Sequence, residues 1–428
     1  MKQFVSKIWN STSARNVGKL LSANVFAQAI GLLVYPVLTR MYAPEDFGVL
    51  SLFASISGVL IILSTLGYHE AIVLPKEEED AHAITVFSFS LIAATSLLLF
   101  FSIPFAGKIA GIFNSPTLEN FYWLLPIYVL LSGIWNVLNY WFIRQKEYGR
   151  ISGFQMSQSI FSCIYKVGFG KFGMLHGGLI YSAILSLLCS LVLSIMRLLK
   201  THLYPLMTWN WSECKAAART YSNFPKYSLP HSLINTFAGQ MPVLLLSPFF
   251  SSREVGFWSL ALLLSYVPIS LITRALYQVY FQKVSEWVNN RKSIVPFFRR
   301  FTLLTLGLIV PFFIGLWFVL PTLTSWLLGR EWTITGQYIR WLLPWLVCNT
   351  LCASTGYLYD IFFKQKQGLY FEILVLICRV IGLGIGIEYN SFEIAIAGYA
   401  LGGALANGIQ YIWLMWLVRQ YEDSLMNA

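Results

Sequence analysis

The chain is organised as long runs of apolar residues separated by short polar segments. A helix that crosses a bilayer needs about 20 mostly apolar residues, whereas the strands of an outer-membrane barrel alternate apolar and polar positions. The runs do not alternate, so the pattern predicts an all-α integral membrane protein with about 12 transmembrane helices. The expected spans are residues 19–40, 48–68, 83–106, 120–143, 153–173, 177–198, 226–249, 255–278, 300–321, 338–360, 369–388 and 393–418.

Two stretches between these runs are too polar to span. Residues 199–225 mix tryptophans with Lys215 and Arg219, which predicts a helix lying at the cytoplasmic interface. Residues 322–337 are expected to form an outer loop, with Trp326 and Trp332 at headgroup level. The expected organisation is an N-terminal six-helix lobe (1–198), an interfacial linker (199–225) and a C-terminal six-helix lobe (226–428).

An internal repeat supports two lobes. At a constant offset of 208 residues, Asp46 corresponds to Glu254 and Gly48 to Gly256. A second echo pairs Phe142 with Phe362. The segments that carry these matches are RMYAPEDFGVLSLF and PFFSSREVGFWSLA, then FIRQKEYG and FFKQKQGL. The repeat predicts two pseudo-symmetric lobes around a central cavity that opens alternately to each side of the membrane.

The composition excludes a soluble enzyme and a disordered chain. Hydrophobic residues make up 57% and charged residues 11% of the chain, against about 25% charged in soluble proteins. The formal net charge is +11, and most of the 30 Lys and Arg residues fall in segments that the twelve-span topology places in the cytoplasm. This bias predicts that both termini are cytoplasmic, and it explains the charge without a nucleic-acid partner.

Three segments resemble a known family. They are LTRMYAPEDFGVL, AIVLPKEEEDA and LALLLSYVPISLITRALYQVYFQKVSE, which begin at Leu38, Ala71 and Leu260. The chain resembles the polysaccharide-transport (Wzx-type) flippases of the multidrug/oligosaccharidyl-lipid/polysaccharide (MOP) exporter superfamily. The resemblance implies a MATE-like, two-lobe protein of the bacterial inner membrane. Such a protein would carry undecaprenyl-pyrophosphate-linked oligosaccharide for O-antigen, capsule or exopolysaccharide among membrane lipids, with other polysaccharide-assembly proteins as further partners.

Basic residues inside the spans are the candidate substrate site. A charged side chain at the bilayer centre costs about 2.5–3.5 kcal/mol on insertion scales, so its retention suggests a function. An Arg fork matches the oxygens of a pyrophosphate headgroup. The residues predicted to line a cationic cavity are Lys166, Arg379, Arg274, Arg40 and Arg340.

Each of these cations also has a simpler interpretation. Arg40 and Arg340 lie near outer helix ends, where a long side chain can reach the interface. Arg379 can pair with Glu372 or Glu388, whereas Lys166 has no acidic partner within its own span.

Acidic residues bear on the energy source. Glu70, Asp360 and Glu372 are candidates for coupling transport to protons or sodium, and His69 beside Glu70 is expected to titrate near neutrality. A structural salt bridge from Asp360 to Lys364 at i,i+4 spacing is the alternative.

Two other functions compete with a flippase. A multidrug exporter of the same superfamily fits the helices, but cationic spans would repel cationic drugs. A membrane polymerase or ligase of the same pathway fits the resemblance, but no loop is long enough for a catalytic domain. No P-loop, H-E-x-x-H or G-x-S-x-G motif occurs. We therefore expect a transporter and no enzyme, with no catalytic residue, metal site or cofactor.

Overall fold

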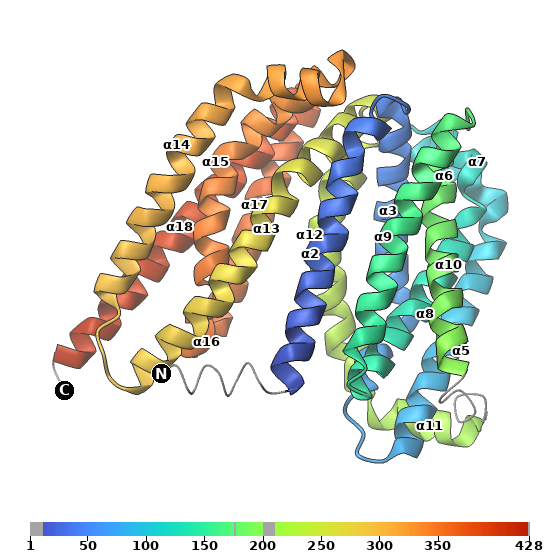
Figure 1. Cartoon of the computed structure of the whole chain (residues 1–428), viewed down its shortest axis with the longest axis horizontal. Helices are drawn as coiled ribbons and strands as arrows, with labels where there is room; N and C mark the ends of the chain where they lie inside the picture. Colours follow the sequence, from blue (N-terminus) through green and yellow to red (C-terminus); the bar gives the residue numbers. More distant parts are fainter. Residues whose placement is uncertain (1–11, 175–176, 200–209, 427–428) are drawn as a thin grey trace. The chain divides into compact units, whose positions relative to one another are not determined.

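The computed structural model describes residues 12–174, 177–199 and 210–426, and these are helical with no β-strand (Figure 1). Each of the twelve predicted spans corresponds to one long helix. These helices are α2 (Thr12–Leu38), α3 (Pro44–Thr65), α5 (Glu78–Phe101), α8 (Leu124–Arg144), α9 (Tyr148–Lys171), α10 (Gly178–Leu199), α12 (Leu229–Leu246), α13 (Ser252–Asn289), α14 (Val295–Leu328), α15 (Thr333–Thr355), α17 (Gln365–Glu388) and α18 (Phe392–Met426).

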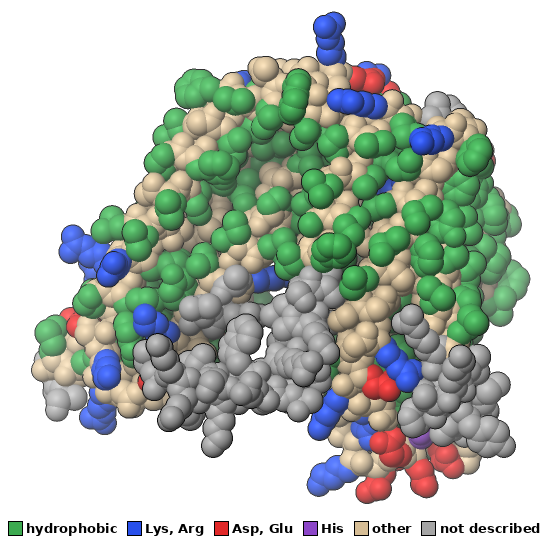
Figure 2. All heavy atoms as spheres, viewed as in Figure 1, with side chains coloured by type: hydrophobic (Ala, Val, Ile, Leu, Met, Phe, Trp, Pro, Cys, Tyr) green, Lys and Arg blue, Asp and Glu red, His purple; other side chains and the backbone are tan. Residues whose placement is uncertain are grey.

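Among the described residues, eight of these helices are long and apolar enough to cross a membrane. The others are α2, α9, α12 and α15, and α2 has an apolar stretch only over Val25–Leu38. Helix α9 is polar because it carries two glutamines and Lys166 along its length. Hydrophobic side chains cover much of the outward surface of the helices, while most charged side chains gather at helix ends (Figure 2). The protein is a multi-pass membrane protein.

The described chain divides into two compact units, Met1–Gly256 and Phe257–Ala428. Helix α12 belongs to the first unit, where it packs against α3. The structural boundary therefore lies beyond the predicted linker. The predicted lobes, 1–198 and 226–428 with the linker 199–225, concern pseudo-symmetry and stay a prediction. Within that linker, residues 200–209 lie outside the described residues.

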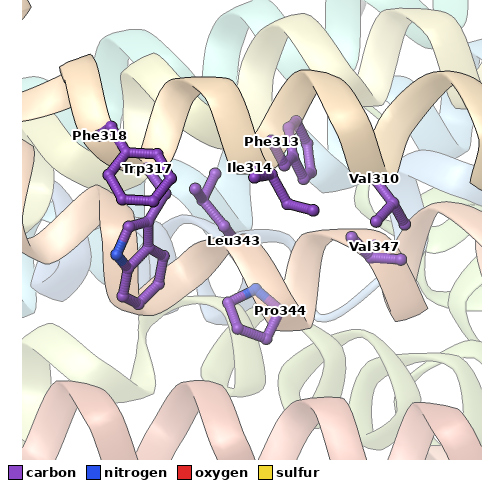
Figure 3. A pocket seen from close by; sticks show the side chains of 8 residues that line it. All are labelled: Val310, Phe313, Ile314, Trp317, Phe318, Leu343, Pro344 and Val347. Atoms are coloured by element: carbon purple, nitrogen blue, oxygen red, sulfur yellow. The ribbon is translucent and has the colours of Figure 1, made fainter.

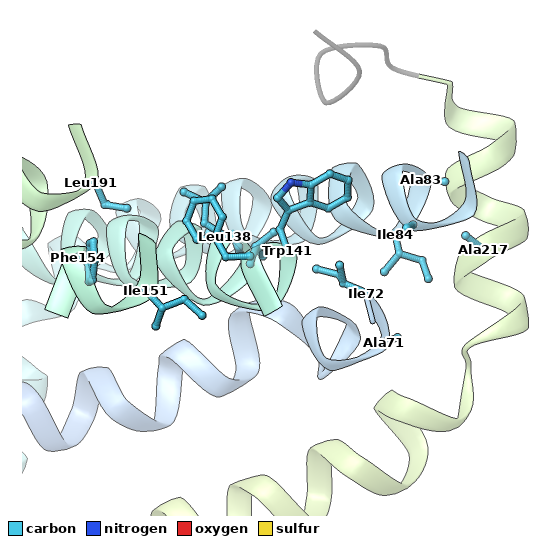
Figure 4. Close-up of a cluster of buried hydrophobic side chains, with 14 of the residues drawn as sticks. Ala71, Ile72, Ala83, Ile84, Leu138, Trp141, Ile151, Phe154, Leu191 and Ala217 are labelled. Carbon is cyan, nitrogen blue, oxygen red and sulfur yellow. The ribbon is translucent and has the colours of Figure 1, made fainter. Parts of the chain in front are cut away.

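The core of the first unit lies where α5, α8, α9 and α10 converge (Figure 4). Trp141, Phe142 and Phe154 are almost fully buried there. The short amphipathic helix α11 (Trp211–Thr220) packs against α5, and Ala217 reaches this core. Its first turn is capped by Asn210, whose side-chain oxygen accepts from the Ser212 N–H at 3.1 Å. The helix predicted in the linker is thus confirmed over Trp211–Thr220.

The second unit is built from the rest of α13 together with α14–α18. Helix α17 packs along α18, and α15 contacts both α14 and α18. An aromatic cluster forms its core, including Phe298, Phe301, Tyr357 and Tyr411. The short helix α16 (Tyr357–Ile361) leads into α17.

The repeat at offset 208 is confirmed by matching contacts within the first unit. Asp46 accepts the N–H of Ala43 at 3.0 Å, and Glu254 accepts the N–H of Ser251 at 3.0 Å. Each carboxylate therefore caps its own helix, at α3 and at α13. The two helix ends also meet, because Arg253 Nη1 lies 3.0 Å from Glu45 Oε1. These two residues are themselves 208 positions apart.

Glycine allows this meeting. A Cβ built on Gly48 would overlap the carbonyl oxygen of Ser252, and a Cβ built on Gly256 would overlap that of Pro44. All four residues obey the offset of 208, so the contact has local two-fold symmetry. Only glycine leaves room for backbones at this separation.

The second echo was predicted in the wrong register. Helices α9 and α17 are each 24 residues long, and their first residues, Tyr148 and Gln365, are 217 positions apart. The turns before them match at the same offset, with φ of 57° at Lys146 and 54° at Phe363. The left-handed residue that ends the preceding helix fixes where the next helix begins, so the two halves correspond at an offset of 217 residues. The Phe142–Phe362 match, at 220, is coincidental.

The predicted outer loop at 322–337 is also wrong. Helix α14 continues through Pro321 to Leu328, a 3₁₀ turn covers Arg330–Trp332, and α15 begins at Thr333. Trp326 is exposed as expected, but Trp332 is buried against Phe257. The prediction failed because it rested on the polarity of the segment, and polar residues do not end a helix that extends beyond the apolar span, as α14 does.

Candidate functional site

The structure places the predicted site residues in two separate groups. The first unit holds Arg40, Glu70 and Lys166, and the second holds Arg274, Arg340, Asp360, Glu372 and Arg379. Four of the eight are exposed, namely Arg40, Arg274, Asp360 and Glu372. The half-buried members are therefore the informative ones.

Arg379 lies between two aromatic rings in the second unit. Its guanidinium carbon is 4.7 Å from the ring centre of Trp345 on α15 and 4.8 Å from that of Tyr399 on α18. Tyr266 stacks on Trp345, with ring centres 5.9 Å apart and an angle of 6° between the planes. Cation–π contacts gain strength where water is excluded. The rings therefore hold a cation in the middle of an apolar helix.

Among the residues that the structure describes, no carboxylate pairs with this cation. Within the described ranges, neither Glu372 nor Glu388 forms an ion pair with Arg379, so the predicted structural pairing is not formed. The Arg379 Nε and the Trp345 Nε1 are both buried, and neither has a hydrogen-bond acceptor. Buried donors without acceptors are costly, and both of these atoms pack against Gly403 of α18.

Close helix packing brings Arg379 to its rings. Helices α17 and α18 cross at glycines, since a Cβ built on Gly382 would overlap the backbone of Gly398. One turn further along α18, a Cβ on Gly403 would lie 3.0 Å from Arg379 Nε and 2.9 Å from Trp345 Cδ1. Small residues at such crossings let membrane helices approach closely.

Lys166 in the first unit is half-buried on α9. The Tyr42 hydroxyl donates to the backbone carbonyl of Lys166 at 2.7 Å, which fixes this part of α9 against the turn before α3. No carboxylate in the described part of the chain forms an ion pair with its ammonium group. Lys166 is spaced from Gln155, Ser159 and Ser162 so that all four share one face of α9.

Arg340 has a structural contact. Its Nε donates to the carbonyl of Trp317 at 2.5 Å, and its Nη2 lies 3.4 Å from that of Phe318. Trp317 is four residues before Pro321, which has no N–H to donate to that carbonyl. Arg340 thus supplies a donor to the carbonyl that Pro321 leaves without one. A role for Arg340 in substrate binding stays a prediction.

We expect Arg340→Ala to destabilise the protein by about 1–3 kcal/mol, because it leaves a half-buried carbonyl in an apolar helix unsatisfied. Pro321→Ala restores an N–H to the Trp317 carbonyl. The loss caused by Arg340→Ala should therefore shrink in a Pro321→Ala background, measured as a double-mutant cycle of thermal unfolding midpoints. Equal losses in both backgrounds would show that Arg340 does not compensate for the proline.

The acidic candidates are dispersed. Burial raises the pKa of the Glu70 carboxyl, and nearby His231 opposes this rise. The neighbouring His69 is expected from its sequence to titrate near neutrality, but burial lowers its pKa to about 4. Tyr277 donates to Asp360 at 3.4 Å. The Asp360–Lys364 pair is not formed in the described chain, because α16 ends between them. Ion coupling through Glu70, Asp360 or Glu372 stays a prediction.

An apolar pocket of about 410 Å³ lies between α14 and α15 (Figure 3). Phe313, Trp317 and Pro344 are among the side chains that line it. It contains no polar group that would select a ligand.

Sequence reasoning missed Trp345 and Tyr399 as partners of Arg379. Aromatic residues are 16% of the chain, so an individual ring carries little signal. The spacing of Gln155, Gln158 and Ser159 on one helix was a usable signal, because glutamines are uncommon in membrane spans.

Comparison with known proteins identifies the family. The family model described as "Polysaccharide biosynthesis protein" matches residues 37–335, which is more than half of the chain. The chain belongs to this family. A curated relative of this family member is the succinoglycan biosynthesis transport protein ExoT of Rhizobium meliloti (strain 1021), 19% identical over 96% of this chain and 81% of the relative.

Solved structures show that the family member has the MOP-superfamily fold. An inward-facing multidrug resistance MATE transporter matches with a TM-score of 0.72, 14% identity and coverage of 92% of this chain and 96% of that one. The lipid II flippase MurJ in an inward closed conformation matches with a TM-score of 0.71, 14% identity and coverage of 94% and 87%. These similarities confirm the predicted fold class.

Proposed function

We propose that this polysaccharide biosynthesis protein is a flippase. It moves undecaprenyl-pyrophosphate-linked oligosaccharide repeat units across the bacterial inner membrane by alternating access, and it is not an enzyme. The family assignment and the transport relative support this proposal. The similarity to multidrug and lipid II transporters supports the fold alone.

The observation that carries the proposal is the unpaired cation in the apolar second unit. Arg379 sits between Trp345 and Tyr399 and has a buried Nε without an acceptor. A pyrophosphate that leaves water loses strong hydration, and fixed donors in a water-poor site replace it. Lys166 adds a second unpaired cation in the first unit. A cationic drug would be repelled by both, which argues against multidrug export.

The topology follows from the charge bias. We place both termini in the cytoplasm, with substrate entering from the inner leaflet. Membrane lipids and the lipid-linked oligosaccharide are its partners, and other polysaccharide-assembly proteins receive the product.

Deleting the gene tests this function. We expect complete lipid-linked repeat units to accumulate on the cytoplasmic leaflet, detected by lipid extraction and by protection from an impermeant glycan-modifying reagent. A plasmid copy should restore polymer. A polymerase defect would instead leave single units exported and attached, and a drug exporter would change drug sensitivity with polymer unaffected. Either of these outcomes would overturn the proposal.

A further inference from the structure

A polar cavity lies within the first unit, separate from Arg379. It has a volume of about 380 Å³, and residues of α2, α8, α9 and α10 line it. Its walls include Gln28, Tyr128, Gln155, Gln158, Ser159 and Ser162. None of the described residues that line it carries a charge.

Packing alone does not account for this cavity. The Oε1 atom of Gln155 is buried and has no hydrogen-bond partner. Unsatisfied polar groups inside a membrane cost several kcal/mol, and membrane proteins place such groups where they line water or a ligand. At about 30 Å³ for each water, the space holds on the order of ten waters. Its size also falls within the roughly 300–1,000 Å³ of small-molecule sites.

The lining selects the chemistry of the ligand. Amides and hydroxyls both donate and accept hydrogen bonds, as the hydroxyls of a sugar do. A hard cation would call for carboxylate oxygens and a phosphate would call for cationic donors, and the described lining residues supply neither. Lys166 lies one turn beyond Ser162 on the same face of α9, so a charged group can bind beside an uncharged one.

We propose that this cavity binds uncharged sugar residues of the translocated glycan. The inference rests on the proposed function. It adds a second subsite, which binds the uncharged part of the same substrate. Gln155 and Gln158 donate to and accept from sugar hydroxyls, and the ring of Tyr128 offers an apolar face. The anionic end of the substrate then lies toward Lys166.

The test replaces both glutamines by methionine, which keeps their length and removes their hydrogen bonds. The protein is reconstituted in lipid nanodiscs, because glycoside detergents carry a sugar themselves. Saturation-transfer NMR with D-glucose, D-galactose and D-glucuronate as probes should give signals for the neutral sugars with the unmodified protein. The Gln155→Met/Gln158→Met variant should lose these signals at least tenfold. Gln145→Met, an exposed change at the end of α8, is the matched control and should keep them.

Three results would overturn the inference. In the first, the unmodified protein gives no sugar signals. In the second, the double variant keeps the signals. In the third, sodium chloride stabilises the unmodified protein but not the double variant. Export in the deletion strain separates the two proposals. If the unmodified gene fails to restore polymer, the proposed function fails. If it restores polymer and the double variant does so equally well, only the sugar site fails.

Discussion

Arg379→Ala is expected to reduce polymer export more than tenfold, a loss of at least about 1.4 kcal/mol in transport efficiency. The substitution removes the cation beside Trp345 and Tyr399 and leaves this place without a charged donor for a pyrophosphate. Protein in the membrane should stay at the unmodified level, because removing an unpaired buried charge does not weaken a helix in lipid. The measurement is polymer yield per amount of protein in the deletion strain.

Three further variants separate charge from packing. Arg379→Met keeps the apolar bulk between the rings and should fail like Arg379→Ala, whereas Arg379→Lys keeps the charge without the fork and should retain part of the activity. Lys366→Ala removes an exposed cation from the first turn of the same helix and should export normally. Normal export by Arg379→Met would show that the guanidinium only fills space.

The order of the twelve long helices could be predicted from the sequence because most of them are runs of apolar residues, and eight are long and apolar enough for a bilayer among the described residues. The error at 322–337 shows the limit of that reasoning. Helix α14 continues through Pro321, and Arg340 on the next helix donates to the Trp317 carbonyl that this proline leaves without a donor. A contact between two helices cannot be predicted from the periodicity of either one.

The candidate site was predictable only in part. Arg379 and Lys166 stand out because charge is rare in the spans, and both are half-buried without an ion-pair partner in the described chain. The surroundings of Arg379 were not predictable. Trp345 and Tyr399 come from two other helices, and glycines on α17 and α18 set the distance at which they meet.

The repeat shows that structurally equivalent positions can carry dissimilar residues. Glu45 and Arg253 occupy equivalent positions and have opposite charges, so a comparison of residues counts them as a mismatch. A local two-fold axis brings equivalent positions together, so opposite charges at Glu45 and Arg253 allow an ion pair that identical residues could not form. Both side chains are about half exposed, so the pair itself contributes at most about 1 kcal/mol. The close backbone packing at Gly48 and Gly256 therefore contributes more to the stability of this contact than the ion pair does.

Gly48→Ala and Gly256→Ala are each expected to destabilise the protein by about 1–3 kcal/mol, because an added methyl overlaps a backbone carbonyl that cannot rotate away. The helix ends at Pro44–Gly48 and Ser252–Gly256 must then separate. Once one methyl has separated them, the second meets less resistance, so the double variant should lose less than the sum of the two. Thermal unfolding midpoints in nanodiscs measure all three.

Gly239→Ala is the matched control, since this helical glycine in α12 has open space around its Cβ position. It should leave stability unchanged or raise it by up to about 1 kcal/mol, as alanine favours helices over glycine. If Gly48→Ala and Gly256→Ala behave like Gly239→Ala, the two helix ends do not touch in the membrane. If the two losses add fully, each glycine acts in a separate contact. The symmetric meeting of α3 and α13 requires loss in each single variant and less than additive loss in the double.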